Sequence, residues 1–183
     1  MAGDLVLMML LFAALAALAV RLDARQAQER QGVPTVADGD SLTLAGQRVR
    51  LRGIDAPEYG QTCRRAGADY PCGKLARQAL VQAIAGQPVS CSGSRHDRYG
   101  RVLGDCRAGD VDLNRVMVAS GWAVAYGDFK AEERAAREAG LGIWAGDFEQ
   151  PQDWRRRRNG MDEPRHDLLA AIGDWLREFF PLP

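Results

Sequence analysis

The sequence lacks a net charge, because its 24 basic residues are balanced by 24 acidic ones. The chain therefore has no global basic bias toward nucleic acid. Lysine is scarce, since only Lys74 and Lys130 occur, and arginine carries the remaining positive charge. Arginine presents a rigid fork of donors that matches phosphate oxygens in pairs. A GC-rich genome would produce the same bias, so arginine usage alone decides nothing.

Internal repeats are absent as well, and 183 residues allow one domain with tails. An apolar fraction of 46% is ordinary for a globular protein. We predict four parts: a signal peptide or membrane anchor over 1–22, a linker over 23–31, the domain over 32–154, and a basic linker with an amphipathic helical tail over 155–183.

The N-terminal run from Leu5 to Val20 has no charged residue. It is long for the core of a signal peptide and short for a membrane span of ~20 residues. Residues 17–19 (Ala-Leu-Ala) resemble a cleavage site. No Lys or Arg precedes the run, whereas Arg21, Arg25 and Arg30 follow it. By the positive-inside rule, these flanks place the C-terminal side in the cytoplasm.

Short strands with tight turns between them dominate the first part of the domain. We expect strands over 33–36, 41–44 and 47–52, then 88–92 and 101–107, with a short segment over 122–125. Helices are expected over 72–85, 111–120 and 129–139. This pattern predicts a mainly β, α+β fold: a five-stranded OB-fold barrel with about three helices, plus an N-terminal apolar helix and a C-terminal amphipathic helix.

The tail from Asp167 to Phe180 has the apolar stripe of an amphipathic helix. Such a helix either docks on its own domain or contacts a membrane surface or a partner. The N-terminal segment is a second candidate for membrane contact. We expect the protein to be a monomer.

Four cysteines allow three disulfide pairings. Cys91 and Cys106 are equidistant from the tip of a predicted hairpin, so they should face each other across its strands. Cys63 and Cys72 bracket a loop that can bring its ends together. Four free thiols and a zinc site are the alternatives, but no Cys-x₂-Cys spacing supports zinc. Disulfides persist in oxidising compartments, so we expect export to the periplasm or the exterior, with or without an N-terminal anchor, despite the charged flanks.

Three stretches carry candidate chemistry: residues 37–41 (ADGDS), 50–58 (RLRGIDAPE) and 97–101 (DRYGR). Each alone has a plain explanation as a hairpin turn, a strand end or a hairpin tip. Together they place Asp40 and Asp55 near each other in one meander, with no His or Cys in either stretch. Paired carboxylates need a cation between them, and oxygen ligands suit calcium or magnesium. Arg50 and Arg101 could then clamp a phosphate.

These stretches resemble the thermonuclease (staphylococcal-nuclease-like) family, whose pattern runs Asp-Gly-Asp-Ser/Thr, Arg-x-x-x-x-Asp-x-Pro-Glu and Asp-x-Tyr-Gly-Arg. The resemblance continues through residues 121–126 (GWAVAY) and 140–144 (GLGIW). It implies an OB barrel with three helices. It also implies calcium, held by Asp40, Asp55 and the main-chain carbonyl of Ala56, where family members often have Thr.

The resemblance further implies that Glu58 is the base, that Arg50 and Arg101 are the phosphate clamp, and that the outer substrate contacts are Arg98, Tyr99 and Tyr126. The implied reaction hydrolyses DNA and RNA, with single strands preferred, and leaves 3′-phosphate ends. Either Arg101 or a water protonates the leaving oxygen. Asp128 replaces a family aromatic, which weakens base stacking. An inactive OB-fold module that binds nucleic acid is the main alternative, and a membrane-linked assembly protein is another.

Overall fold

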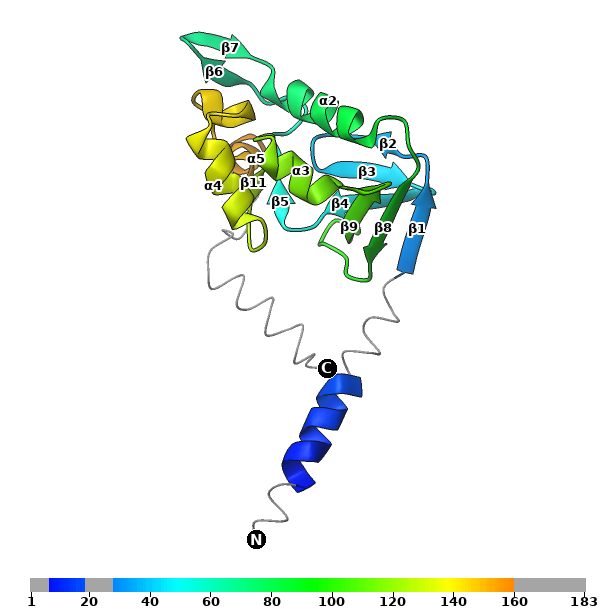
Figure 1. Cartoon of the computed structure of the whole chain (residues 1–183). Helices are drawn as coiled ribbons and strands as arrows, with labels where there is room; N and C mark the ends of the chain where they lie inside the picture. The colour runs from blue at the N-terminus through cyan, green and yellow to red at the C-terminus, as the bar shows by residue number, and fades with distance from the viewer. Residues whose placement is uncertain (1–6, 19–27, 160–183) are drawn as a thin grey trace.

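A mixed sheet is the frame of the molecule in the computed structural model, which describes residues 7–18 and 28–159 (Figure 1). Hydrogen-bonded neighbours follow the order β1-β8-β9-β4-β3-β2, and β10 pairs with β9. The strands are β1 (Gln28–Gly32), β2 (Thr35–Val36), β3 (Ser41–Leu44), β4 (Gln47–Leu51), β8 (Val89–Gly93), β9 (Val102–Ala108) and β10 (Val111–Asp112). All pairs are antiparallel except β4 with β9, which is parallel.

Two smaller ladders extend this frame. Strand β5 (Ile54–Asp55) pairs with β11 (Val124–Ala125), and β6 (Cys63–Arg65) forms a hairpin with β7 (Ala68–Tyr70). The helices are α2 (Cys72–Ile84), α3 (Leu113–Ala119), α4 (Lys130–Glu138) and α5 (Pro151–Asn159), with a 3-10 turn η1 (Gly142–Ala145). The predicted α+β class is confirmed.

The β3–β4 hairpin follows directly from its turn residues. Ala45 and Gly46 both adopt positive φ angles, of 50° and 77°, as a two-residue turn of the primed type requires. The resulting register pairs Ser41 with Arg50. The apolar side chains of both strands enter the core: Leu42, Leu44, Val49 and Leu51. Buried side chains of α2 and α3 belong to the same core: Leu80, Leu113 and Met117. The hairpin thereby aligns the polar residues at its open end.

The sheet does not close into the expected barrel among the described strands, because its ladder runs from β1 to β2 without joining the two. The fold is OB-like rather than a closed barrel. The last residues of the expected linker over 23–31 are not a linker in the structure. They belong to strand β1 (Gln28–Gly32), which pairs with β8 from Gly93 to Val89. The backbone hydrogen bonds of this edge strand outweigh its polar composition.

Both predicted disulfides are confirmed. Cys63 is bonded to Cys72 with a Cα–Cα distance of 5.6 Å, and Cys91 to Cys106 at 4.1 Å. Cys91 and Cys106 are register partners in β8 and β9, as the hairpin argument expected. No cysteine within the described residues is free.

Residues 7–18 are helical, and their apolar side chains are exposed. Among the described helices, none is both long and apolar enough to cross a membrane. The predicted tail helix over 167–180 lies outside the described residues.

Candidate active site

The first two motifs meet at the open end of the β3–β4 hairpin. Asp40 immediately precedes β3, and its carbonyl oxygen accepts a hydrogen bond from the Leu51 amide at 2.8 Å. Arg50 lies in β4, opposite Ser41. Asp55 lies in β5, which the β11 ladder holds beside this hairpin. Strand register and one short loop therefore bring both aspartates to the same arginine.

Arg50 lies between the two aspartates. Its Nη2 is 3.1 Å from Oδ2 of Asp40 and 2.5 Å from Oδ1 of Asp55. All three residues are buried. Burial alone would raise the pKa of Asp55, yet Arg50 and a second arginine bring it below its ordinary value. Asp55 is therefore a buried, ionised carboxylate.

Asp38 adds a third carboxylate, although the sequence analysis gave it no role. Its Oδ1 accepts a hydrogen bond from the Asp40 amide at 3.0 Å. Burial and the nearby Asp40 carboxylate raise the pKa of Asp38 to about 7. Gly39 permits this close approach, because a Cβ there would lie 2.7 Å from the Cβ of Ala56 and 2.8 Å from that of Ala76.

Glu58 provides a fourth carboxylate. Its amide donates to the side-chain oxygen of Gln61 at 3.3 Å, and Gln61 is fully buried. The backbone of Gly73 in α2 packs against the carbonyl of Glu58, where a Cβ would come within 1.7 Å of the oxygen. Burial raises the pKa of the Glu58 carboxyl. Glu58 is thus held beside the aspartates in a state that accepts protons more readily than a free glutamate.

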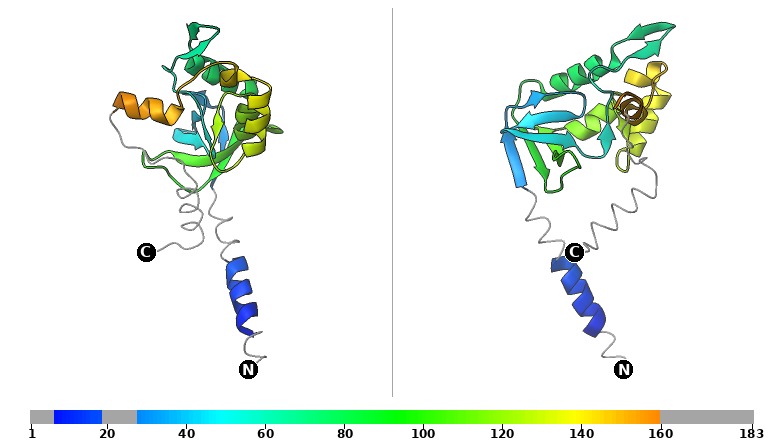
Figure 2. Two further views of the ribbon diagram at one scale, coloured as in Figure 1. Left: turned by 90° about the vertical axis from the view of Figure 1, so that its left-hand side faces the viewer. Right: turned by 180° about the vertical axis from the view of Figure 1, so that it is seen from behind.

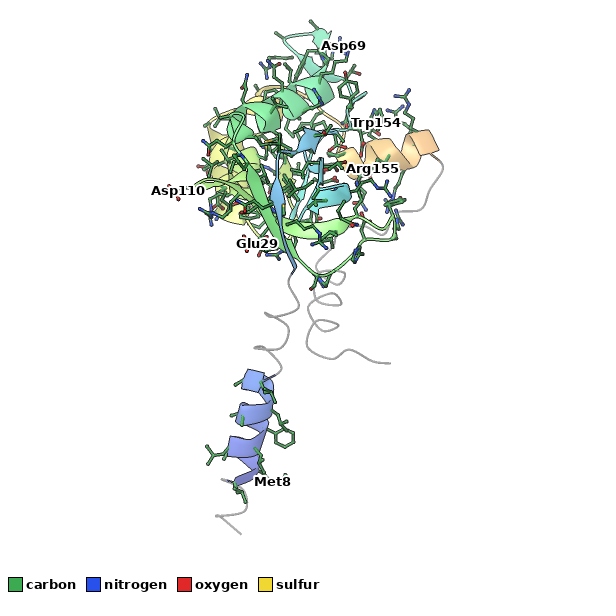
Figure 3. The ribbon with its side chains drawn as sticks, turned by 90° about the vertical axis from the view of Figure 1, so that its right-hand side faces the viewer. Met8, Glu29, Asp69, Asp110, Trp154 and Arg155 are labelled. Atoms are coloured by element: carbon green, nitrogen blue, oxygen red, sulfur yellow. A yellow bond between two sulfur atoms is a disulfide. The ribbon has the colours of Figure 1, made fainter. Side chains whose placement is uncertain are left out.

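Arg155 of α5, which is labelled in Figure 3, joins two of these carboxylates. Its Nη1 is 2.9 Å from both Oδ1 of Asp55 and Oε1 of Glu58, and its Nη2 is 3.0 Å from Oδ2 of Asp55. The sequence predicts a basic linker at this position and gives Arg155 no place in the site. Four consecutive arginines, 155–158, gave no signal as to which one reaches a site 100 residues earlier in the chain.

Arg101 approaches the cluster from the β8–β9 connection. Its Nε donates to Asp97 at 2.7 Å, and its Nη1 donates to the Ser41 hydroxyl at 3.3 Å. That hydroxyl in turn donates to Oδ1 of Asp40 at 2.8 Å. Arg101 is therefore linked to the carboxylates through one hydroxyl.

Arg98 and Tyr99 lie at the tip of the same connection. The guanidinium of Arg98 is 4.9 Å from the centre of the Tyr99 ring, and that of Arg101 is 5.5 Å from it. Both residues at the tip are exposed. They therefore lie outside the buried part of the cluster, next to Arg101.

Tyr126 borders the cluster on the β11 side. Burial raises the pKa of its hydroxyl, and the opposing effect of the neighbouring Arg50 is too small to cancel this rise. Tyr126 and Asp55 also line a cavity of about 490 Å³. Asp128 pairs with Arg52 at 2.9 Å, so it cannot serve as a stacking surface.

The donor chemistry of this cluster fits a divalent cation. Asp38, Asp40, Asp55 and Glu58 supply four carboxylates against two guanidinium groups, Arg50 and Arg155. The Ala56 amide donates to Oδ2 of Asp40 at 3.0 Å, which places this segment of main chain at the cluster. Yet no group of three or more His, Cys, Asp or Glu residues in the described ranges is already arranged around a metal position. The guanidinium groups hold the acceptor oxygens instead.

Comparison of the sequence with known proteins shows which family the chain resembles. The sequence model of the family described as staphylococcal nuclease homologue matches residues 48–146. The succinoglycan biosynthesis protein ExoI of Rhizobium meliloti (strain 1021) is 41% identical over 169 residues, which cover 88% of this chain and 80% of that protein. The probable staphylococcal-like nuclease CAN2 of Oryza sativa subsp. japonica is 34% identical over 144 residues, 74% of this chain and 37% of its own length. An uncharacterized endonuclease of Escherichia coli is 32% identical over 138 residues, 69% of this chain and 84% of that protein. The chain belongs to the staphylococcal nuclease family.

Proposed function

We propose that this chain is a calcium-dependent endonuclease that hydrolyses DNA and RNA to products with 3′-phosphate ends. The observation that carries the proposal is the buried cluster in which Asp40 and Asp55 flank Arg50. Family membership supports a hydrolytic nuclease. An inactive module that only binds nucleic acid would have no need to bury two aspartates around an arginine, because such burial is costly without a function.

Asp40, Asp55 and the carbonyl of Ala56 would hold the calcium ion. When bound, calcium would supply positive charge that polarises the scissile phosphate and stabilises its developing negative charge. Glu58 would orient a water and accept its proton, a role for which the raised pKa of its carboxyl suits it.

Arg50 and Arg101 would bind the non-bridging oxygens of the phosphate and stabilise charge as it grows there. In the reaction, the water oxygen bonds to phosphorus as its proton passes to Glu58, and the bond from phosphorus to the 5′-oxygen breaks. The 5′-oxygen then takes up a proton. A guanidinium hardly releases a proton, so a second water is a donor at least as suitable as Arg101.

Substrate binding would involve Arg98, Tyr99 and Tyr126. Asp128 has no ring, so it adds no stacking surface to that of Tyr99 and Tyr126. We therefore propose a preference for single-stranded or otherwise flexible substrates, whose backbone can enter the site without the cost of unstacking a duplex.

The test is a calcium-titrated digestion of single-stranded DNA, duplex DNA and RNA by the full chain. We expect cleavage that chelator abolishes and calcium restores, fastest on single strands, with 3′-phosphate ends on the products. Asp55→Asn should lose this activity. Undiminished cleavage in excess chelator would refute the metal requirement, and tight binding without any cleavage would favour the inactive module.

We also propose that the domain works outside the cytoplasm. The two disulfides support this location, since such bonds persist in oxidising compartments. A reporter fused after the domain tests the location, and a cytoplasmic signal from it would contradict the proposal.

A further inference from the structure

Helix α5 delivers a third arginine to the carboxylate cluster, and its own contacts fix its approach. The carbonyl of Glu149, just before the helix, accepts a hydrogen bond from the side chain of Gln61 at 2.7 Å. Gln61 also bonds to the amide of Glu58. Arg157 pairs with the Glu149 carboxylate through two bonds, of 3.1 and 2.7 Å. The loop that carries Glu58 and the start of α5 are thus tied together, and Arg155 faces the cluster.

Arg155 engages the oxygens that a divalent cation would need. Its two terminal nitrogens meet the two oxygens of Asp55 at 2.9 and 3.0 Å, while one of them also meets Glu58 at 2.9 Å. Calcium takes about six to eight oxygen ligands, from carboxylates, carbonyls and waters, at about 2.3–2.6 Å. The paired contact of Arg155 occupies a lone pair on each oxygen of Asp55, and Arg50 takes a second one on Oδ1, so little acceptor capacity is left for calcium. Calcium would also bring a third positive charge to a carboxylate that two arginines already share. Arg155 and calcium cannot both bind Asp55 in this way.

Arg155, rather than Arg50, is the group able to move. Both side chains are largely shielded, with 8% of Arg50 and 14% of Arg155 exposed, but Arg50 is held within the sheet by the pairing of β4 with β3 and β9. Arg155 sits on a helix at the edge of the domain, which Figure 2 shows in orange. The cavity beside Asp55 is lined by Gln152 and Asp153 of the same helix. This cavity offers the displaced side chain both room and a carboxylate.

We propose that Arg155 is a tethered competitor of the divalent cation: its guanidinium must leave Asp55 before calcium binds there, and it thereby sets the calcium affinity of the site. The inference rests on the proposed function, since it takes calcium to be the cation. It assigns to α5 a control of metal affinity that none of the three motifs contains.

The experiment is calorimetric titration of the full chain with calcium alone, without nucleic acid. Arg155→Gln removes the competing charge but keeps a side chain of similar reach, and we expect calcium affinity to rise about tenfold or more. Arg155→Lys keeps the charge but loses the paired geometry, so a smaller gain is expected. The matched control is Arg158→Gln in the same helix, whose affinity should stay within about twofold of wild type because the Arg158 guanidinium lies over the Trp154 ring, 4.9 Å from its centre, rather than on a carboxylate of the cluster.

Equal or weaker calcium binding by Arg155→Gln than by wild type would overturn the inference while leaving the proposed function standing. Absence of calcium binding in all variants would overturn both. Circular dichroism shows whether each variant is folded. If Arg155→Gln is not folded, the calcium affinity of Arg155→Lys is compared with that of wild type instead. A supporting result also requires that calcium lowers hydrogen-exchange protection of residues 151–159 in wild type more than in Arg155→Gln.

Discussion

Replacing Asp38 by Asn should stabilise the protein in a pH-dependent manner when metal is kept away by chelator. Burial beside Asp40 raises the pKa of Asp38 from 3.8 to about 7, so the folded state binds this proton more tightly than the unfolded chain. The free energy of unfolding therefore falls as pH rises from about 4 to about 7. The full penalty above that range is at most about 4 kcal/mol, at 1.36 kcal/mol for each pH unit. Asparagine does not titrate and can still accept the hydrogen bond from the Asp40 amide.

The assay is urea denaturation of both proteins in chelator at about pH 5, 6, 7 and 8, followed by tryptophan fluorescence. The stability advantage of Asp38→Asn should grow by about 3 kcal/mol from the lowest to the highest pH, because about two pH units separate pH 5 from the folded pKa of about 7, at 1.36 kcal/mol for each. Asp97→Asn is the control: burial alone would raise the pKa of Asp97, but hydrogen bonds from Arg101 prevail and lower it. That variant should be destabilised by a similar amount throughout this range. An Asp38→Asn advantage that stays flat or shrinks with rising pH would refute the assigned repulsion.

Four further variants test other parts of the site and fold. Glu58→Gln and Arg101→Lys should each lower kcat by ~10²-fold or more with the fold intact, and near-normal kcat in steady-state digestion would remove that residue from its role. Gly73→Ala should reduce kcat by displacing the Glu58 backbone, since the added Cβ would fall 1.7 Å from its carbonyl oxygen; an unchanged crystal position of Glu58 and unchanged kcat would contradict this. Replacing both Cys91 and Cys106 by Ala should lower the free energy of unfolding by about 3 kcal/mol for a bridge with a sequence separation of 15, and equal urea midpoints would argue against it.

Local signals in the sequence predicted the parts of the fold that local geometry determines. The Ala45-Gly46 turn and the alternation of apolar residues fixed the β3–β4 hairpin, and equal distances from a hairpin tip identified Cys91 and Cys106 as partners. The helices α2, α3 and α4 lie within two residues of their predicted bounds at each end. In each case the deciding interactions are between residues near in sequence.

Elements held by distant partners escaped prediction. Strand β1 is polar and has no alternating pattern, so only its pairing with β8, some 60 residues later, makes it a strand. The Cys63–Arg65 and Ala68–Tyr70 hairpin looked like a disulfide-bridged loop. The predicted closed barrel failed for the same reason. Closure requires a pairing between the terminal strands, and local patterns show neither its presence nor its absence.

The residues of the candidate site also differ in how far the sequence predicts them. Asp40, Arg50, Asp55 and Glu58 come from two short motifs, and the structure brings them together as their spacing suggested. Arg155 comes from a run of four arginines that composition alone assigns to a linker. Its position depends on how α5 packs, which is a property of the tertiary structure.

The span matched by the family model, residues 48–146, does not include every residue of the carboxylate cluster. Asp40 lies before that span and Arg155 lies after it. A recombinant fragment cut at the matched bounds would lose one of the two aspartates that flank Arg50, together with the arginine that holds the other. Chimeras that exchange this nuclease domain with a relative should therefore be joined outside residues 28–159, so that the whole sheet, both aspartates and Arg155 come from the same protein.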